Sequence, residues 1–493
     1  MGMCSLSLLE SRLRRDRGGL GPDVCIDSRK VTRGSVFVAL PPVGVVGEHA
    51  AGGAAFIHDA LARGAGYIVC APEQAVACPA DQVEVVDCAE PRKALGQLLR
   101  ARYGTDLLSF PLVGVTGTNG KTTCTYLLAH LFEAAGRKTG VLGTVAYRWP
   151  GHVEDAPMTT PDCPDLHAML AAMQRQDVGI AFMEVSSHAL DQERVAGLEF
   201  SGAVFTNLTQ DHLDYHGDMD RYFKAKARLF RELCSSSAVR VVGADNEWGR
   251  TLLELVPEAW GYGLQAQPAG AAFLGGEMIS SGTAGLRLRM RYAGKTWELH
   301  SPLVGRFNAE NLLAVQALAL GFDLTPADFQ CFETFNGVPG RLERIPNPAN
   351  LDIFVDYAHT PDALVNVLTS LRGAGFQRIV TVFGCGGDRD RTKRPLMGEA
   401  VARFSDVAVL TSDNPRHEDP EAIMADVMPG LKGAGQVLRE PDRGTAILKA
   451  LDLLKPGDVL LVAGKGHERT QQIGDVKHPF SDQRIIREIL GCA

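Results

Sequence analysis

A glycine-rich segment at residues 114–123 contains the residue types that bind nucleotide phosphates. It reads Gly-Val-Thr-Gly-Thr-Asn-Gly-Lys-Thr-Thr, and a short apolar run that begins at Leu112 leads into it. In such a turn, backbone N–H groups converge on phosphate oxygens, and the following helix N-terminus adds a favourable dipole. Lys121 would bind the terminal phosphates, and the Thr122 hydroxyl would bind magnesium. The segment therefore indicates chemistry on a nucleoside triphosphate.

The spacing of this loop differs from the usual G-x-x-x-x-G-K-[ST] pattern. Val115 stands five positions before Gly120, so Gly114 and Gly117 give a variant arrangement. A plain glycine-rich turn between a strand and a helix is the alternative interpretation. The position of Gly-Lys-Thr at the junction of a strand and a helix favours the phosphate loop.

The elements around the loop predict an α/β fold. Behind it, apolar residues recur at i, i+3, i+4, i+7, i+8 and i+11 from Cys124, which is the spacing of one helix face. A turn-rich segment at residues 337–340 closes a helical stretch that begins at Asn308. Beyond it, helical patterns alternate with strand-like runs, which predicts a mostly parallel sheet with helices on both faces. These runs are 352–355, 378–383, 406–410 and 458–463.

The chain has 493 residues, too many for one hydrophobic core. We expect three α/β domains, at residues 1–108, 109–339 and 340–493. The first contains strand-like runs at 35–40 and 66–70 with a helical pattern at 57–63 between them. We expect a P-loop ATPase-like parallel or mixed sheet in the central domain and a Rossmann-like sheet in the C-terminal domain.

The composition is typical of a soluble globular protein, with 45% hydrophobic and 22% charged residues. No apolar stretch is long enough for a membrane span, and the N-terminus lacks the charge order of a signal peptide. Eleven cysteines without a C-x-x-C pair favour free thiols in a reducing compartment. The net charge of −8, without a basic run, argues against a nucleic-acid partner. A cytoplasmic location is expected.

Six segments, in order, resemble the motifs of one enzyme family. The phosphate loop Gly-Thr-Asn-Gly-Lys-Thr is the form of the Mur ligases and the related folylpolyglutamate synthetases. The other five are Met-Glu-Val-Ser-Ser-His-Ala-Leu at 183–190, the segment 206–216 with Asp-His-Leu-Asp, Gly-Arg-Phe-Asn-Ala-Glu-Asn at 305–311, Pro-Gly-Arg at 339–341 and Asp-Tyr-Ala-His-Thr-Pro-Asp-Ala at 356–363. The chain is similar to a Mur ligase over most of its length after residue 110.

The resemblance implies an ATP site with magnesium. The residues matching its ATP contacts are Gly114, Gly117, Thr118, Asn119, Gly120, Lys121, Thr122, Thr123, Asn308, Asn311, Arg341 and Asp356. Those matching its magnesium ligands are Thr122, Glu184, His212 and Lys226, the last as a carboxylated lysine. Catalytic roles are expected for Lys121, Lys226, His212, Arg341 and His359. Taken alone, His212 would be interpreted as a capping or core histidine, and Asp356 as a turn cap.

The C-terminal domain indicates which amino acid is used. Asp413, Asn414, Pro415 and Arg416 form a string that resembles the recognition motif of the diaminopimelate-adding members of the family. Lysine-adding members lack the arginine, whose planar guanidinium can bind the distal carboxylate bidentately. Further contacts to the amino acid are implied for Arg389, Gly464 and Glu468. Asn-Pro also favours a strand-end turn, and the two interpretations are compatible.

The N-terminal and central domains are expected to hold a uridine-diphosphate substrate. The residues matching its contacts are Ser28, His49, Ala50, Ala51, Thr159, Thr160, Ser186, Gln192 and Arg194. Two features depart from the family. Met158 replaces an asparagine, and the loop at 43–53 is rich in alanine and glycine where many relatives carry an acidic residue.

The implied reaction is ATP-dependent addition of meso-diaminopimelate to UDP-N-acetylmuramoyl-L-alanyl-D-glutamate, for peptidoglycan synthesis, by a monomer. One alternative is a sibling ligase that adds lysine, acts at another step or extends folates, against which the Asp413–Arg416 string counts. A P-loop ATPase or regulatory switch would leave Arg389, Arg416 and Glu468 unexplained. A pure binding module would leave the phosphate loop idle.

Overall fold

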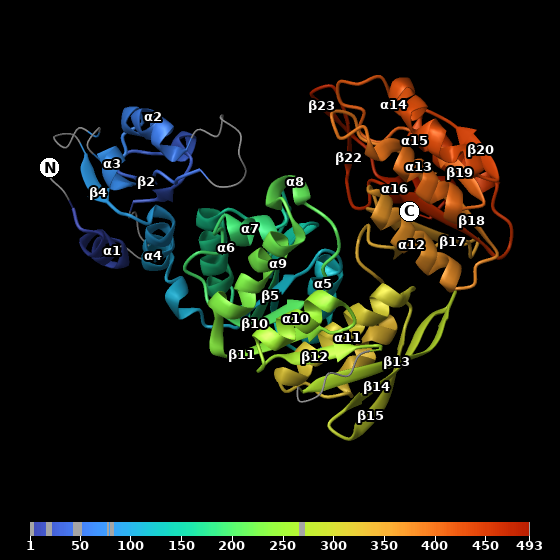
Figure 1. Cartoon of the computed structure of the whole chain (residues 1–493), viewed down its shortest axis with the longest axis horizontal. Helices are drawn as coiled ribbons and strands as arrows, with labels where there is room; N and C mark the ends of the chain where they lie inside the picture. Colours follow the sequence, from blue (N-terminus) through green and yellow to red (C-terminus); the bar gives the residue numbers. More distant parts are fainter. Residues whose placement is uncertain are drawn as a thin grey trace. The chain divides into compact units, whose positions relative to one another are not determined.

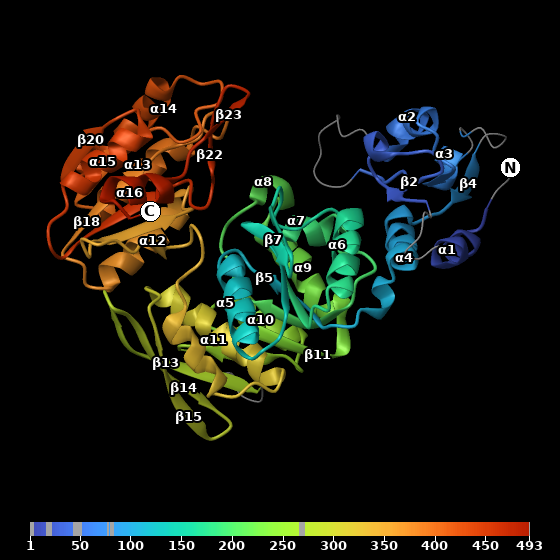
Figure 2. The same ribbon diagram turned by 180° about the vertical axis from the view of Figure 1, so that it is seen from behind.

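The computed structural model describes residues 4–15, 22–42, 52–75, 78, 83–265 and 272–492. It divides into two compact units, Met1–Leu274 with Ala314–Thr325, and Gly275–Leu313 with Pro326–Ala493 (Figures 1 and 2). It is an α/β protein, as predicted. The predicted boundaries of three domains, at residues 108 and 339, remain a prediction. Among the described residues, no helix has the length and apolar character that a membrane span requires.

The first sheet is small and entirely parallel, in the order β1-β2-β3-β4. Its strands are β1 (Val24–Cys25), β2 (Val36–Val38), β3 (Tyr67–Cys70) and β4 (Glu84–Asp87). Its helices are α1 (Leu6–Arg15), α2 (Ile57–Ala62), α3 (Pro72–Ala75) and α4 (Pro91–Tyr103). The strand-like runs and the helix predicted in this region are therefore present.

The second sheet has eleven strands in the order β15-β14-β13-β12-β11-β10-β5-β9-β6-β7-β8. Its parallel strands are β5 (Leu112–Thr116), β6 (Thr139–Leu142), β9 (Ile180–Glu184), β10 (Phe200–Phe205), β11 (Cys234–Gly243) and β12 (Trp260–Gly263). Antiparallel pairs lie at both ends, formed by β7 (Ala146–Trp149), β8 (His152–Asp155), β13 (Phe273–Gly282), β14 (Gly285–Tyr292) and β15 (Lys295–Ser301). The sheet is mixed, as expected.

Helices cover both faces of this sheet. They are α5 (Lys121–Ala134), α6 (Cys163–Arg175), α7 (Ser187–Asp191), α8 (Leu213–His216), α9 (Met219–Arg228), α10 (Glu247–Leu255) and α11 (Arg306–Gly321). On one face, α6 and α9 contribute Leu170 and Phe223 to a core that includes Phe205 of the sheet. On the other, Phe132 of α5 contacts Phe182 of β9 at 5.3 Å between ring centroids. Burial on both faces explains why these strands are continuously apolar.

The third sheet has the order β16-β17-β21-β18-β19-β20 and is parallel except at β16. Its strands are β16 (Glu343–Arg344), β17 (Asp352–Asp356), β18 (Arg378–Phe383), β19 (Val407–Leu410), β20 (Gln436–Arg439) and β21 (Asp458–Ala463). Its helices are α12 (Pro361–Gly373), α13 (Lys393–Phe404), α14 (Pro420–Val427), α15 (Arg443–Asp452) and α16 (Asp482–Leu490). A hairpin of β22 (Thr470–Ile473) and β23 (Val476–Pro479) stands apart from this sheet.

Strand residues of the third sheet alternate between two cores. Phe354 and Leu461 pack with α12, α13 and α14, whereas Val355 and Leu460 pack with α15 and α16. This is the arrangement of helices on both faces that the alternating pattern of the sequence predicts.

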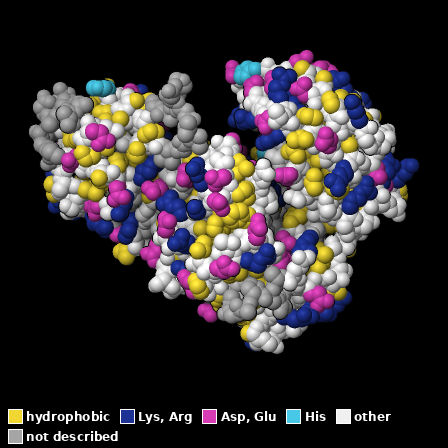
Figure 3. Space-filling view, in the orientation of Figure 1, with side chains coloured by type: hydrophobic (Ala, Val, Ile, Leu, Met, Phe, Trp, Pro, Cys, Tyr) yellow, Lys and Arg dark blue, Asp and Glu magenta, His cyan; other side chains and the backbone are white. Residues whose placement is uncertain are grey.

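Charged side chains of both signs lie among hydrophobic and uncharged ones on the surface that Figure 3 shows. In Figure 3, acidic and basic side chains are interspersed over the described part of that face. The β14–β15 pair gives an example, because Arg287 and Arg289 both form ion pairs with Glu298.

Candidate active site

The phosphate loop lies at the carboxyl end of β5, where two neighbouring strands also end. Thr116 of β5 is in register with Phe205 of β10, and Val115 with Glu184 of β9. The carboxyl ends of parallel strands form the usual binding edge of an α/β sheet. Residues that follow β5, β9 and β10 in the sequence therefore meet at one place.

Two glycines give the loop its shape. Gly117 has φ +146° and Gly120, at the N-cap of α5, has φ +87°, conformations that side chains rarely adopt. A Cβ on Gly117 would also collide with Thr206 Oγ1. The Thr206 hydroxyl donates to Asn119 O at 2.5 Å, and Asn119 N donates to Asn207 Oδ1 at 3.0 Å. The segment after β10 therefore holds the loop in place.

Both predicted lysines reach this loop. Lys121 Nζ donates to Gly117 O at 2.9 Å and to Thr118 O at 2.8 Å, and Lys226 Nζ donates to Gly117 O at 2.8 Å. Lys226 is buried. Burial, and then the charge of Lys121, lowers the pKa of Lys226 well below its usual range. A lowered pKa increases the fraction of neutral amine at neutral pH.

Thr122 and Glu184 form the start of an oxygen-rich site. Thr122 Oγ1 donates to Glu184 Oε2 at 3.0 Å. Thr144 donates to the same carboxylate from N at 2.8 Å and from Oγ1 at 3.0 Å. Hydroxyl and carboxylate oxygens are the donors that magnesium prefers, with few protein ligands, so these side chains fit that ion. Thr144 was not among the predicted residues.

His212 lies near the two lysines in a strained conformation. Its φ is +52°, and its ring makes an edge contact with His188 at 4.8 Å between centroids. Burial lowers the pKa of His212; the charge of Asp211 opposes this, while those of Lys121 and Lys226 lower it further. The neutral imidazole that results is the form that binds metals.

The residues predicted to bind the uridine-diphosphate substrate continue from Glu184. Thr159 Oγ1 lies 3.1 Å from Thr144 Oγ1, and Thr160 Oγ1 donates to Glu184 O at 2.8 Å. Ser186 N donates to Thr160 Oγ1 at 3.1 Å. The hydroxyl groups thus form one chain of contacts leading away from the phosphate loop.

Gln192 and Arg194 extend this chain. Arg194 Nη2 donates to Gln192 Oε1 at 2.7 Å, and Arg194 Nη1 donates to Thr160 O at 3.3 Å. Met158, at the position that departs from the family, contacts Arg194 through its sulfur at 3.3 Å. The guanidinium is therefore held in place although the asparagine is absent.

A cavity of about 220 Å³ lies beside Gln192 and Arg194. Its lining also includes Leu40, Pro41 and Gly52 from the first α/β region. Arg92, which was not predicted, lines it and donates to Gln192 O at 2.9 Å and Pro41 O at 2.6 Å. Its position joins the first region to the second.

Of the remaining uridine predictions, the structure describes Ser28 alone. Ser28 is buried at the start of a short 3-10 helix, Ser28–Lys30, which Asp27 caps. Ser28 is absent from the described lining of the cavity. His49, Ala50 and Ala51 lie outside the described residues.

In the second unit, the predicted amino-acid residues follow three adjacent strands, β21, β18 and β19. Asn414 Nδ2 donates to Glu468 Oε2 at 3.0 Å, and Lys465 Nζ donates to Asn414 Oδ1 and Glu468 Oε2 at 3.0 and 2.9 Å. Burial raises the pKa of Glu468, but the charge of Lys465 and the hydrogen bond of Asn414 outweigh it and lower the pKa overall. Lys465 was missed, although it stands between two predicted residues.

Two charged groups of this site have free polar atoms. Asp413 Oδ2 is buried without a hydrogen-bond partner among the described residues, next to Gly464, whose φ is +115°. Arg416 Nη1 donates to Gly387 O at 2.6 Å, the single hydrogen bond of this guanidinium among the described residues. The exposed side chain of Arg389 makes none within the described chain. An anionic and a cationic group are thus both available to a zwitterionic ligand.

Tyr357 lies close to both ends of this site. Burial raises the pKa of Tyr357; the nearby charges of Glu468 and Asp413 raise it further, and those of Arg341 and Arg389 oppose this. The Arg341 guanidinium lies 4.8 Å from the centre of the Tyr357 ring, and its Nε is buried without a partner in the described chain. Arg341 is therefore a further available cation.

The other predicted nucleotide residues of this unit make local contacts. Asn308 Nδ2 donates to Val304 O at 2.8 Å, and Asn311 Nδ2 to Asn308 Oδ1 at 3.4 Å. Asp356 accepts from Leu342 N at 2.5 Å and Ala358 N at 2.8 Å, which is the turn-capping role considered for it. His359 Nδ1 lies 2.8 Å from Tyr357 O.

The fold is α/β; its glycine-rich loop has the geometry suited to phosphates, and the residues after β18, β19 and β21 present charges suited to a zwitterion. The Mur ligase middle domain model matches residues 115–319, the Mur ligase glutamate ligase domain model residues 340–466, and the Mur ligase family catalytic domain model residues 23–103. The chain belongs to the Mur ligase family.

Individual relatives agree with this assignment. The chain is 60% identical over 493 residues, all of both chains, to the UDP-N-acetylmuramoyl-L-alanyl-D-glutamate–2,6-diaminopimelate ligase of Lawsonia intracellularis. It is 42% identical to the ligase of the same name from Synechococcus elongatus, over 94% of this chain and 92% of the relative. A solved structure of an enzyme of that name, 32% identical, has a TM-score of 0.68 over 96% of this chain and 95% of its own.

Proposed function

We propose that this protein is the ATP-dependent ligase that joins meso-diaminopimelate to UDP-N-acetylmuramoyl-L-alanyl-D-glutamate. The observation that carries this is full-length identity of 60% to a relative named for that reaction. Two features agree with the name. The first unit carries the phosphate loop, and the second carries Asp413 and Arg416, each with polar atoms left free among the described residues.

The phosphate loop is proposed to bind ATP. Lys121 and backbone N–H groups at the start of α5 would hold the terminal phosphates. In the second unit, Asn308, Asn311, Asp356 and His359 are proposed as further nucleotide contacts, and Arg341 as a residue that binds phosphoryl charge. Its buried Nε, which has no partner among the described residues, supports that role, since a ligand oxygen would satisfy it.

Thr122, Glu184, His212 and a carboxylated Lys226 are proposed to hold magnesium. Bound magnesium would neutralise charge on the phosphates as it develops. Carbon dioxide reacts with the neutral form of an amine, and the lowered pKa of Lys226 favours that form. The product is a carboxylate, which adds oxygen donors where the unmodified side chain has none.

The predicted amino-acid residues that follow β18, β19 and β21, here called the third site, are proposed to recognise the distal centre of the diamino acid. Arg416 would bind the distal carboxylate, and Asp413 and Glu468 the distal ammonium. Lys465 holds Glu468 Oε2, which leaves the other carboxylate oxygen for the ligand. L-Lysine lacks the distal carboxylate and would leave Arg416 unpaired.

The proposed reaction proceeds through an acyl phosphate. An oxygen of the D-glutamyl carboxylate attacks the γ-phosphorus of ATP, and the bond to ADP breaks. The diaminopimelate amine attacks the acyl phosphate carbon and loses a proton. The tetrahedral intermediate then expels phosphate, which leaves an amide. Lys121 and Arg341 would stabilise the phosphoryl charge, and orientation of the reactants would contribute much of the rate.

An isotope experiment tests this route. UDP-N-acetylmuramoyl-L-alanyl-D-glutamate labelled with ¹⁸O in both oxygens of the reacting carboxylate is incubated with ATP and meso-diaminopimelate. One labelled oxygen is expected in the released phosphate and the other in the amide of the product. Unlabelled phosphate alongside product would overturn the acyl-phosphate route.

The location and assembly of the protein follow as further proposals. Nucleotide substrates and the free thiols of the described cysteines agree with a cytoplasmic location. The predicted monomer remains a prediction.

A further inference from the structure

Two turns of the third site pack directly against each other. The first turn, residues 384–389, follows β18 and carries Arg389; the second, residues 411–418, follows β19 and carries Arg416. Gly387 N donates to Asn414 O at 2.9 Å, and Arg416 Nη1 donates to Gly387 O at 2.6 Å. A Cβ on Gly387 would collide with Pro415 O, so the turns approach as closely as backbone permits.

Each turn contains one non-glycine residue in the left-handed region. Asp388 has φ +52°, and Arg416 has φ +50°. Such conformations are disfavoured for side chains other than glycine and persist where surrounding contacts enforce them. The direction of the Arg416 side chain therefore depends on contacts that hold the two turns together.

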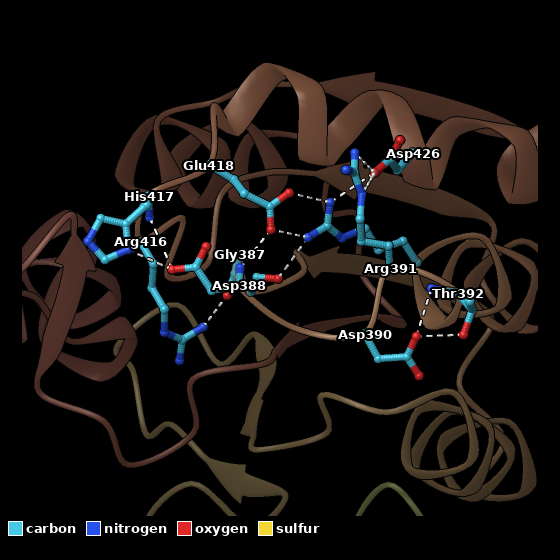
Figure 4. Close-up of polar contacts among 11 residues, drawn as sticks. Gly387, Asp388, Asp390, Arg391, Thr392, Arg416, His417, Glu418 and Asp426 are labelled. Carbon is cyan, nitrogen blue, oxygen red and sulfur yellow. Dashed lines mark hydrogen bonds and ion pairs between the residues drawn. The ribbon is translucent and has the colours of Figure 1, made fainter. Parts of the chain in front are cut away.

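Glu418 of the second turn makes hydrogen bonds that hold the two turns together. Its Oε1 accepts from Asp388 N at 2.6 Å and from Arg394 Nη2 at 2.7 Å, and its Oε2 accepts from Arg394 Nη1 at 3.0 Å. Figure 4 shows Glu418 directed toward the first turn, with Arg416 reaching Gly387 beside it. The hydrogen bond of Arg394 lowers the pKa of Glu418 to about 2, so its carboxylate is charged at neutral pH.

Arg394 anchors this carboxylate from α13. Its side chain is 2% exposed, and its Nη2 also lies 3.4 Å from Gly386 O of the first turn. A second carboxylate, Asp426 of α14, accepts from Arg394 Nη1 at 2.9 Å and also binds Arg391. Asp426 thus shares the same guanidinium, but among the described residues it forms no hydrogen bond or ion pair with either turn.

We propose that Arg394 and Glu418 are positioning residues that set the affinity for the diamino acid by locking the two turns together. The inference rests on the proposed function, because it assigns the third site to that ligand. Without the Glu418 charge, Asp388 N would lose its charged acceptor, and the Arg394 guanidinium would lose a bidentate partner. Arg389 and Arg416 would then no longer be fixed in the geometry that the diamino acid requires.

The two carboxylates on Arg394 allow a matched comparison. Glu418→Gln and Asp426→Asn each remove one charge from the same buried arginine, in the full-length protein. Steady-state kinetics are measured with each of the three substrates varied in turn. For E418Q we expect the KM for meso-diaminopimelate to rise by about tenfold or more, with the KM for ATP and for the UDP-dipeptide within about twofold. For D426N we expect all three KM values within about twofold.

The melting temperatures of both variants separate positioning from folding. A merely structural role would lower the melting temperatures of both variants and leave the KM for diaminopimelate unchanged, which would overturn the inference. If E418Q does not fold, Glu418→Asp is used. It retains the charge, but it is too short to reach both Asp388 N and Arg394, so the same rise in KM is expected. A wild-type protein with no diaminopimelate-dependent turnover would instead refute the proposed function.

Discussion

At the scale of single residues, Arg416 is the side chain on which the choice of amino acid depends. Its backbone is left-handed, and one nitrogen is committed to Gly387 O. The rest of the guanidinium stays available as a planar, always charged donor for a carboxylate. A lysine at this position would keep the charge but lose the two parallel donors.

Arg416→Lys is therefore expected to raise the KM for meso-diaminopimelate by about tenfold to a hundredfold, because a bidentate charge-assisted contact is reduced to a single one. The value of kcat should change less, since the reacting amine lies at the other centre of the ligand. Steady-state kinetics measure both. Arg484→Lys is the control, because the exposed Arg484 of α16 pairs with Glu488 and is not assigned to the binding of diaminopimelate. An unchanged KM for diaminopimelate in R416K would contradict the assignment.

Some site residues could be predicted from the sequence, and others could not. Lys121, Thr122 and Glu184 belong to motif strings, and the structure brings Thr122 and Glu184 into contact. Thr144 lies 40 positions from Glu184, and no local sequence pattern predicts the hydrogen bond between them. The same holds for Arg394 with Glu418, because long-range contacts depend on the fold and leave no periodic signal.

At the scale of helices and strands, patterns predicted the elements that are buried on both faces. The runs at 352–355, 378–383, 406–410 and 458–463 correspond to β17, β18, β19 and β21. Strands with one exposed face were missed, among them the antiparallel β13, β14 and β15. In β14 the burial alternates, and charged residues on its less buried face, such as Arg287 and Arg289, interrupt an apolar run.

His167 of α6 shows how one buried side chain joins several elements. Its Nδ1 lies 2.5 Å from Thr105 Oγ1 and its Nε2 2.9 Å from Ala196 O. Burial lowers the pKa of His167 to about 4 from an ordinary value near 6.5. The folded protein therefore keeps this ring neutral under conditions in which the unfolded chain would protonate it.

The pH dependence of stability has a definite sign here. Between pH 6.5 and about 4, the unfolded state binds a proton on His167 that the folded state does not. The free energy of unfolding therefore decreases as the pH is lowered through this range. The contribution of His167 should reach about 3 kcal/mol. His167→Gln is expected to lower stability at pH 7 but to make the decline toward pH 4 shallower, as measured by urea denaturation at several pH values. The control is exposed His300→Gln, which should retain the wild-type slope; a wild-type slope in H167Q would refute this account.

At the scale of the whole molecule, the parallel strands of the second and third sheets place polar residues after their carboxyl ends. The phosphate loop follows β5, and the diamino-acid residues follow β18, β19 and β21. The sequence motifs identified the family and the order of these sites. The uridine contacts could be predicted less fully, because His49, Ala50 and Ala51 fall outside the described residues and Ser28 lies away from the cavity lining.

Coupling of ATP use to amide formation is the central property of such a ligase. Phosphate release from ATP is measured with purified protein and UDP-N-acetylmuramoyl-L-alanyl-D-glutamate, in the presence of meso-diaminopimelate, of L-lysine or of no amino acid. Release that requires meso-diaminopimelate and accompanies the UDP-tripeptide is the predicted result. Release with lysine alone would contradict the role of Arg416, and equal release under all three conditions would contradict the assignment as a ligase.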